Sequence, residues 1–414
     1  MPSREHGYTG LVRAVRSRIF VSGQAVSLLG DGLAVLAIPL LVLRLTHSPL
    51  LAALASAPRT IGYLLVGLPS GPIVDRADPW RLLVAMDVVR AAIFVALFLL
   101  GLAHVRSVAV ILVLAMVAAG AGVFFESALT VAVRDVFTGP DLIRANSFLE
   151  MAGQTSVVIG PAVVGVLAAG LGVDVALLAD AATFAVSLAT LFAVRRDRAV
   201  PARPPRVALW TEFRAGLTYI ARTRLILTLV IVQAVINLCL AVEKLIIFFA
   251  GTTLGLAASL VSLAVIGGGA GGVAGAFTAR RIVARVGALP LVAACLALIG
   301  VALAAMGAAV DVWWLAASNL VLVWATVVAN IVLRTLRQQI VPRRLLGRVT
   351  STVRTICLAL TPVGAVVAGA LTAALGGDPR PVFLGAGLLI VVTAVIAWAV
   401  ALGPMARGLR GGRQ

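Results

Sequence analysis

The chain has 414 residues, of which 61% are hydrophobic and only 12% are charged, and its mean hydropathy is +1.11. Soluble domains average about 45–50% apolar and about 25% charged residues, so this composition excludes a soluble enzyme and indicates a polytopic membrane protein. The net charge of +18 does not indicate nucleic-acid binding, because the basic residues cluster in short links between apolar runs.

Twelve apolar runs are each long enough to cross a hydrocarbon core of about 30 Å, which takes about 20 helical residues. In chain order they are 19–43, 50–74, 82–103, 107–133, 147–171, 173–194, 225–249, 254–279, 288–310, 312–334, 352–376 and 380–402. The sequence therefore predicts an all-α membrane protein of twelve transmembrane helices. The even number of crossings predicts that both termini lie on one side.

The basic residues predict which side that is. With a cytoplasmic N-terminus, 27 of the 34 lysines and arginines face the cytoplasm, four lie within spans, and three (Arg44, Arg106 and Arg380) face the opposite side. Because cytoplasmic loops of membrane proteins carry the excess of Lys and Arg, both termini are predicted to be cytoplasmic. The richness in Arg, Ala and Gly favours a bacterial chain, hence the inner (plasma) membrane.

A central link and an internal repeat divide the chain. The proline-rich link 195–224 separates predicted six-helix halves at 1–194 and 225–414, and its part 208–222 can form a short amphipathic helix on the membrane surface. Paired features recur at offsets of 201–204 residues: Gly71 with Gly275, Pro140 with Pro342, and Pro161 with Pro362. Duplicated halves are typical of secondary transporters, whose substrate site lies near the bilayer midplane between the repeats.

Several motifs resemble those of the major facilitator superfamily. The link after the second span reads GPIVDRADPWRLL, and VIGPAVVG (158–165) in span five is similar to the antiporter motif of that superfamily. The motifs LGD (29–31), MDVVRA (86–91), PDLIRAN (140–146) and LAD (178–180) followed by Phe184 resemble more closely the bacterial drug:proton antiporters that include macrolide efflux and enterobactin export proteins. The resemblance covers the whole chain. It implies two pseudo-symmetric six-helix bundles, alternating access and a monomer.

The resemblance also implies a cytoplasmic gate. Its residues are Gly71, Asp75, Arg76 and Arg81, with the aspartate holding basic groups or a helix N-terminus of the other half. A carboxylate is stabilised at such an end by the helix dipole. The usual glycine and basic residues after Asp-Arg are replaced here by Asp78 and Pro79, and Ala279 stands at the second-half position of Asp75, so only the first copy can act as a charged latch. The alternative is that these arginines serve only topology.

Charges inside spans are costly, about 2.5–3.5 kcal/mol each on insertion scales, so each needs a reason. Asp31 in span one is the first candidate for proton coupling, with Glu126 and Glu243 as alternatives, and Arg59 is a candidate partner for Asp31 or for an anionic substrate group. Asp31 can instead be a packing residue, and Glu243 can belong to a pair with Lys244. Asp87, three residues before Arg90, is interpreted as its structural partner, and Asp180 as structural.

The other polar or aromatic residues on spans one, seven and ten predict a large apolar pocket with a few hydrogen-bonding groups. They are Gln24, Gln233, Asn237, Asn319, Trp324 and Asn330. Such a pocket suits amphipathic drugs or lipophilic natural products. The alternative for each is an amide that only joins helices.

Span five and span eleven are predicted to bend. Gly160, Pro161 and Gly165 form the antiporter-like motif, and Pro362 interrupts span eleven. The sequence contains no metal-ligand spacing, cofactor motif or catalytic constellation, so we expect neither metal nor cofactor, and no enzyme.

Together these features predict a secondary transporter that exports a hydrophobic or amphipathic small molecule in exchange for protons. The partners would be that molecule, protons and the lipid bilayer, with no nucleic acid. Two alternatives remain open: an importer of a nutrient or siderophore with the same fold, and a transport-inactive membrane sensor or scaffold.

Overall fold

The computed structural model describes the backbone of residues 3–48, 51, 54–55, 57–105, 107–194, 209–256 and 258–411. The first half of the predicted link, 195–208, lies outside these residues, as do some side chains within the helices, including that of Arg59. The described chain groups into two compact units. Unit 1 comprises Met1–Phe213 with Val341–Ser351, and unit 2 comprises Arg214–Ile340 with Thr352–Gln414.

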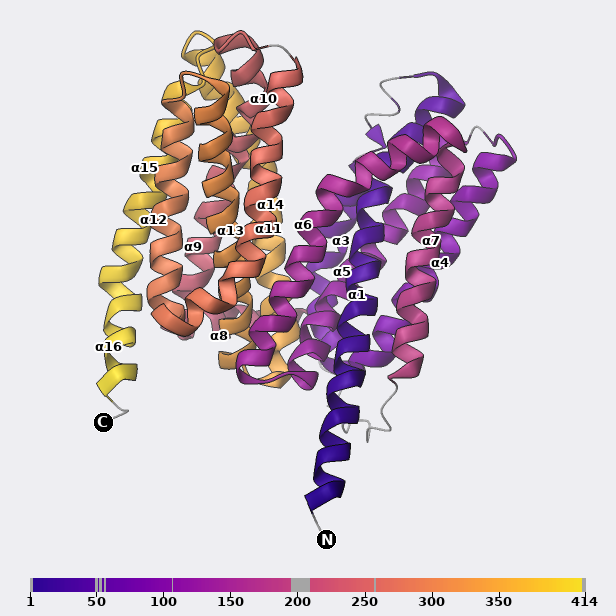
Figure 1. Ribbon diagram of the computed structural model, residues 1–414, viewed down its shortest axis with the longest axis horizontal. Coiled ribbons are helices and arrows are strands. Elements are labelled where there is room, and N and C mark those ends of the chain that lie inside the picture. Colours follow the sequence, from indigo (N-terminus) through magenta and orange to yellow (C-terminus); the bar gives the residue numbers. More distant parts are fainter. Residues whose placement is uncertain are drawn as a thin grey trace. The chain divides into compact units, whose positions relative to one another are not determined.

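Unit 1 is a bundle of long helices (Figure 1). They are α1 (Ser3–Thr46), α3 (Ala57–Arg76), α4 (Pro79–Leu102), α5 (Val108–Val136), α6 (Gly139–Gly170) and α7 (Val173–Ala193). Helix α1 packs against α6 and α7, while α5 packs against α3 and α4. Proline at the first position of α4 and Asp78 at its N-cap, which accepts the Trp80 N–H at 2.9 Å, define where that helix begins.

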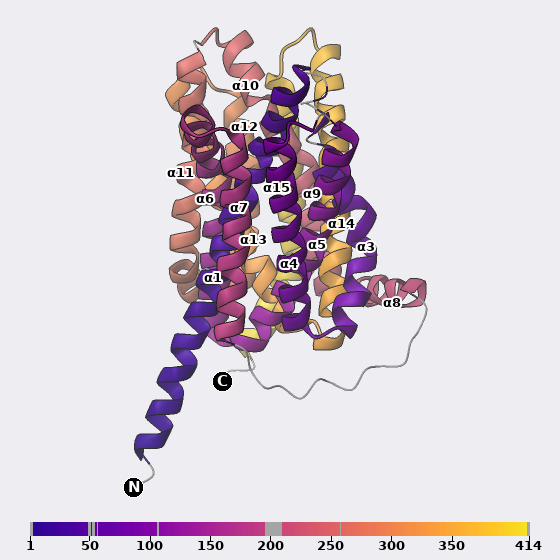
Figure 2. The ribbon, with the colours of Figure 1, turned by 90° about the vertical axis from the view of Figure 1, so that its right-hand side faces the viewer.

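Unit 2 holds the remaining helices, in which α11 and α12 pack against α13, and α15 packs against α12 and α9. They are α8 (Leu209–Arg222), α9 (Arg224–Leu240), η1 (Ala241–Leu245), α10 (Ile246–Phe248), η2 (Phe249–Thr253), α11 (Ala258–Val286), α12 (Ala288–Gly307), α13 (Val312–Ile340), α14 (Arg343–Ala374), α15 (Arg380–Ala397), η3 (Trp398–Leu402) and α16 (Gly403–Gly411). The short α8 coincides with the predicted helix at 208–222, and Figure 2 shows it running across the direction of α9. The first residues of α8, up to Phe213, and those of α14, up to Ser351, belong to unit 1.

All twelve predicted spans coincide with helices, which confirms the all-α membrane fold. Within the described residues, nine helical segments are long and apolar enough to cross a membrane, and the bent α6 makes a tenth. The other two predicted spans fall on α3 and α11. Span seven is continuous from Arg224 to Thr253 but changes from α-helix to a 3-10 turn at Ala241–Leu245 and a π turn at Phe249–Thr253.

Large apolar side chains are exposed along the spans, as a lipid-facing surface requires. Val166 on α6 is 74% exposed, Val366 on α14 is 72% exposed and Leu388 on α15 is 64% exposed. A soluble monomer does not present so many exposed Val, Leu and Ile side chains. The free cysteines, Cys239, Cys295 and Cys357, are all buried.

Helices α1 and α6 approach closely at two glycines. A Cβ placed on Gly160 would lie 2.5 Å from the carbonyl carbon of Gly32, and the Ser156 hydroxyl donates to the Leu29 carbonyl at 3.0 Å. Only glycine permits this backbone separation. Helix α6 bends by 42° between Gly139–Val157 and Ile159–Gly170. Pro161 accounts for the bend, because a proline ring clashes with the carbonyl of the residue four positions earlier. The crossing fixes the part of α1 that carries Asp31.

Candidate functional site

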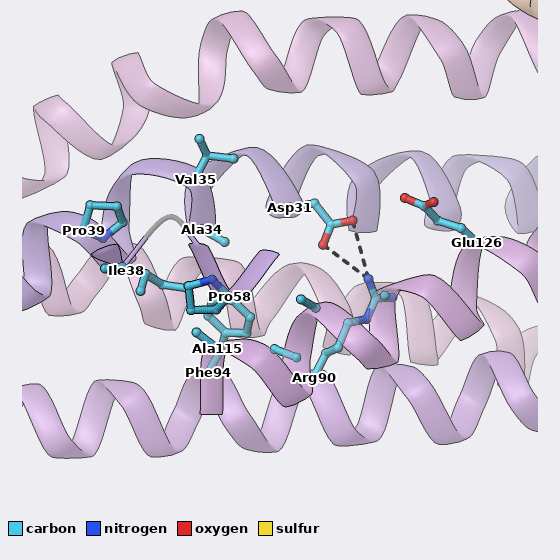
Figure 3. A pocket seen from close by; sticks show the side chains of 14 residues that line it. Asp31, Ala34, Val35, Ile38, Pro39, Pro58, Arg90, Phe94, Ala115 and Glu126 are labelled. Atoms are coloured by element: carbon cyan, nitrogen blue, oxygen red, sulfur yellow. Dashed lines mark hydrogen bonds and ion pairs between the residues drawn. The ribbon is translucent and has the colours of Figure 1, made fainter. Parts of the chain in front are cut away.

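A cavity of about 140 Å³ lies inside unit 1 (Figure 3). Most of its wall is apolar and comes from α1, α3, α4 and α5, and its residues are Asp31, Ala34, Val35, Ile38, Pro39, Ala55, Pro58, Arg90, Phe94, Ala115, Ala118, Ala119, Gly122 and Glu126. The three charged residues of this wall gather toward one end of the cavity, as Figure 3 shows. The cavity therefore joins an apolar wall to a small charged cluster.

Arg90 is the centre of that cluster, and its side chain is only 2% exposed. Its Nη2 donates to Asp87 on the same helix at 2.5 Å, and its Nη1 donates to Asp31 on α1 at 3.3 and 3.5 Å. The Ser27 hydroxyl accepts a further bond at 3.3 Å. Two carboxylates from two helices thus share one buried guanidinium.

The two carboxylates differ in their surroundings. Asp87 is fully buried and accepts the Ser187 hydroxyl at 2.6 Å, and Ser187 in turn accepts the amide N–H of Gln24 at 3.0 Å. Asp31 is 33% exposed, lines the cavity and holds Arg90 at longer distances. Asp87 is therefore the fixed partner of Arg90, and Asp31 is the partner that the cavity contents can reach.

Two aromatic rings cover the guanidinium. The Arg90 Cζ lies 4.0 Å from the centre of the Phe125 ring and 4.3 Å from that of Phe184. Cations at such distances are attracted by the ring faces, most strongly where water is excluded. These rings stabilise the charge of Arg90 without taking up its hydrogen-bond donors.

Of the other unit 1 residues proposed from the sequence, Glu126 lines the same cavity, extending from α5 toward the Asp31 end in Figure 3. Gln24 does not line it and instead belongs to the buried chain through Ser187 to Asp87. Arg59 lies in α3, but its side chain is outside the described part of the structure. In the described part of the structure, the arginine that pairs with Asp31 is Arg90.

The predicted gate aspartate binds the start of α14. Asp75 accepts the backbone N–H groups of Gly347 at 2.7 Å and Arg348 at 3.1 Å, and the Arg348 Nε lies 3.2 Å from its Oδ2. Its side chain is only 2% exposed. Gly71 allows this approach, because a Cβ there would lie 2.7 Å from the Arg348 Cα.

Neighbouring charges extend this contact. Arg343 donates to both oxygens of Asp135 at 2.8 and 2.5 Å, and Arg134 donates to the Val341 carbonyl at 2.5 Å. The predicted gate residue Arg81 is 72% exposed and lies 3.8 Å from Asp78. Arg76 ends α3 and is half-buried.

The polar residues predicted on spans seven and ten belong to unit 2. Asn319 donates to the Ala264 carbonyl at 2.9 Å, and Trp324 Nε1 donates to the Thr278 hydroxyl at 3.0 Å, so both join α13 to α11. Gln233 accepts a bond from Arg337 at 2.5 Å.

Three other predicted residues of unit 2 occupy local positions. Asn237 donates to the carbonyl of Gln233 one turn earlier at 2.8 Å, Glu243 lies in the 3-10 turn η1, and Pro362 lies inside α14.

Sequence reasoning missed Ser27, Phe125 and Phe184 as neighbours of Arg90, and Ser187 as the neighbour of Asp87. A serine or phenylalanine inside an apolar run carries no signal of its own. It also did not identify Arg337, although an arginine at the end of a span, one helical turn after Arg334, marks a charged helix face. In the described residues, no three His, Cys, Asp or Glu side chains are grouped closely enough to hold a metal ion.

Comparison with known proteins decides the family. The family model described as Major Facilitator Superfamily matches residues 20–250, more than half of the chain. The chain belongs to the major facilitator superfamily. It is a multi-pass membrane transporter of small molecules and not an enzyme.

Curated relatives include the multidrug efflux pump Tap of Mycolicibacterium fortuitum, which is 26% identical over 387 residues, covering 89% of this chain and 91% of the relative. Tap of Mycobacterium tuberculosis is 26% identical over 389 residues, covering 89% of each chain. These matches confirm the predicted resemblance to the superfamily and to its drug-export branch.

Solved structures share the fold. A bacterial homologue of the iron transporter ferroportin, in an outward-facing state, superimposes with a TM-score of 0.77 and 16% identity over 93% of this chain and 99% of that chain. The Escherichia coli fucose:proton symporter FucP superimposes with a TM-score of 0.71 and 14% identity, covering 93% and 98%.

Proposed function

We propose that this transporter exports hydrophobic or amphipathic small molecules across the bacterial inner membrane in exchange for protons. The observation that carries the proposal is the sharing of Arg90 between buried Asp87 and cavity-facing Asp31. The names of the mycobacterial relatives, which are multidrug efflux pumps, support the direction and the substrate class.

Proton coupling requires a carboxyl group that can bind a proton in one state and pair with a cationic group in the other. When Asp31 is ionised it balances Arg90, and when it takes a proton the guanidinium keeps its charge partner in Asp87. The guanidinium of Arg90 therefore has a carboxylate partner in both states, and protonation of Asp31 removes the excess negative charge of the two-acid, one-arginine cluster. Protonation removes the negative charge of Asp31 from the charged end of the cavity. The cavity then binds a cationic or hydrogen-bonding substrate more weakly.

The cavity wall supports an apolar cargo. Val35, Ile38 and Phe94 line it, and burial of apolar surface contributes about 25 cal/mol for each Å² removed from water. Glu126 supplies a second acidic group at the charged end. An apolar wall with few polar groups binds by size and hydrophobicity more than by a fixed set of hydrogen bonds.

Alternating access is proposed to be gated by Asp75. While it holds the amides of Gly347 and Arg348, the start of α14 is locked to α3, and transport requires that these bonds break and re-form. The carboxylate is favoured there both by the two N–H donors and by the positive end of the α14 dipole. With both termini cytoplasmic, this latch would close the cytoplasmic side, in a protein that works as a monomer.

The test uses purified protein in liposomes with an imposed pH gradient. With an acidic lumen, inside-out oriented protein should accumulate ethidium or erythromycin, and Asp31→Asn should not. Accumulation that ignores the pH gradient would refute proton coupling, and concentrative uptake by right-side-out protein alone would favour the importer.

A further inference from the structure

Arg337 near the end of α13 is a buried cation whose charge is not balanced by an acid in the described structure. It is 9% exposed, and its Nη1 donates to Oε1 of Gln233 on α9 at 2.5 Å. The amide is neutral, so this bond satisfies a donor without compensating the charge. The Cys357 thiol on α14 and a second cation, Arg334, are among its ionisable neighbours.

Unit 2 offers no acid that could approach Arg337. Its segments 214–340 and 352–414 contain three carboxyl side chains, those of Glu243, Asp311 and Asp378. Asp311 precedes the first turn of α13, about 39 Å from Arg337 at a rise of about 1.5 Å per residue. Glu243 lies in η1, which follows the end of α9, whereas Arg337 contacts α9 at Gln233. Asp378 precedes α15.

The internal repeat shows how this imbalance arises. Arg337 lies 203 positions after Arg134, within the spacing that relates the two halves. Arg134 is followed by Asp135, which ion-pairs with Arg343, whereas Arg337 is followed by Gln338. The second-half position thus carries the arginine with no acid beside it in the sequence.

Other polar groups accompany Arg337 on its own helix. On α13, Asn330, Arg334 and Arg337 follow one another at four and three residues, so they share one helix face. The buried Cys357 lies near both Arg337 and Arg354. A buried guanidinium that forms no ion pair among the described residues can receive a carboxylate or phosphate, with which arginine makes paired, charge-assisted hydrogen bonds.

We propose that Arg337, with Gln233, binds an anionic group, either a carboxylate or a phosphate. The anion supplies the charge that Arg337 lacks, and Gln233 orients the guanidinium toward it. The inference rests on the proposed function where the anion belongs to the transported molecule, which would then be an amphipathic acid. The headgroup of an anionic phospholipid offers the same chemistry.

The experiment measures binding, without transport, to the full-length protein in nanodiscs. The probes are naphthalene-1-acetate and its uncharged amide, and binding is followed by calorimetry in discs of pure phosphatidylcholine and in discs containing phosphatidylglycerol. We expect the acid to bind at least about tenfold more tightly than the amide, and Arg337→Gln to remove that difference. If phosphatidylglycerol abolishes acid binding to the wild type, the site takes a lipid headgroup; if binding persists, it takes a substrate.

Stability separates this role from a structural one. Because Arg337 is an uncompensated buried cation, Arg337→Gln should melt no lower than the wild type in phosphatidylcholine, and added acid should raise the melting temperature of the wild type only. Arg337→Lys, which keeps the charge, should retain part of the binding. The matched control is Arg224→Gln, an exposed arginine of unit 2 that donates to the Val400 carbonyl and should bind as the wild type does.

Equal affinity for acid and amide, in discs with no selective effect of phosphatidylglycerol, would overturn the proposal. So would undiminished acid binding by Arg337→Gln. None of these readouts uses a proton gradient, so the anion site can fail while proton-coupled export stands, and export can fail while the anion site stands.

Discussion

Asp31 on α1 and Asp87 on α4 accept hydrogen bonds from a single guanidinium, that of Arg90. The bond to Asp87 is 2.5 Å long and the bond to Asp31 is 3.3 Å long, a difference of 0.8 Å. Asp87 is also the buried member of the two acids. The two acids are therefore unequal, and substitutions at the two positions should have different effects.

Asp31→Asn should reduce proton-driven transport by at least about tenfold while leaving the amount of protein in the membrane unchanged, because the asparagine cannot exchange a proton. Transport of ethidium in liposomes and immunodetection in membranes measure the two quantities. Asp141→Asn is the matched control, since Asp141 is 66% exposed and pairs with the exposed Arg144. Full transport by Asp31→Asn would remove this residue from the mechanism.

The Asp87→Asn variant should instead be less stable to unfolding than the wild type. Removing one partner of a buried ion pair costs about 3–5 kcal/mol, and here Arg90 would be left with the longer contact to the partly exposed Asp31. Thermal denaturation in detergent should show a large loss for Asp87→Asn and a small loss for Asp31→Asn. The double variant Asp87→Leu, Arg90→Met should recover much of the stability, and a double variant as unstable as the single one would argue against the charge explanation.

Asp75→Asn should loosen the start of α14, because a neutral amide accepts the two N–H bonds more weakly than a carboxylate does. Ser351 is 2% exposed beside Gly71, so a Ser351→Cys reporter should react with maleimide several times faster in the Asp75→Asn background. Arg81→Gln should not change that rate, because Arg81 is exposed and lies near Asp78. An unchanged rate in Asp75→Asn would exclude the latch.

Gly160→Ala should destabilise unit 1, because the new Cβ would lie 2.5 Å from the Gly32 backbone and would force α6 away from α1. Overpacking of this kind costs about 1–3 kcal/mol. Gly165→Ala, five residues further along the same helix, has open space around its Cβ and should melt with the wild type. Equal melting temperatures for the two variants in a thermal scan would contradict the close approach.

The spans were predictable because they depend on one property, a long enough apolar run, and span length is set by the bilayer. The partner of Asp31 was not. The sequence indicated Arg59 as the candidate partner and assigned Arg90 to Asp87, whereas Asp31 contacts Arg90, 59 positions away, because of how α1 and α4 are rotated about their axes. The Asp87–Arg90 pair could be predicted, because both residues lie on one helix three positions apart.

The latch was partly predictable. The motif around Asp75 indicated a helix N-terminus as the partner, but the two backbone donors at Gly347 and Arg348 carry no side-chain signal in the sequence. The polar residues of spans seven and ten showed the reverse difficulty. Their chemistry suggested a pocket, yet Asn319 and Trp324 bond to α11, and only packing can decide between these outcomes.

The aromatic faces beside Arg90 make it hard to replace. A flat guanidinium can turn within the space between Phe125 and Phe184, exchanging one acid for another while its faces stay against the rings. A lysine ammonium is compact and strongly hydrated. At this buried position, its lost hydration could be replaced by hydrogen bonds to the neighbouring carboxylate and hydroxyl oxygens alone. Even the conservative change to lysine should therefore immobilise the charge at Asp87 and disconnect it from whatever enters the cavity.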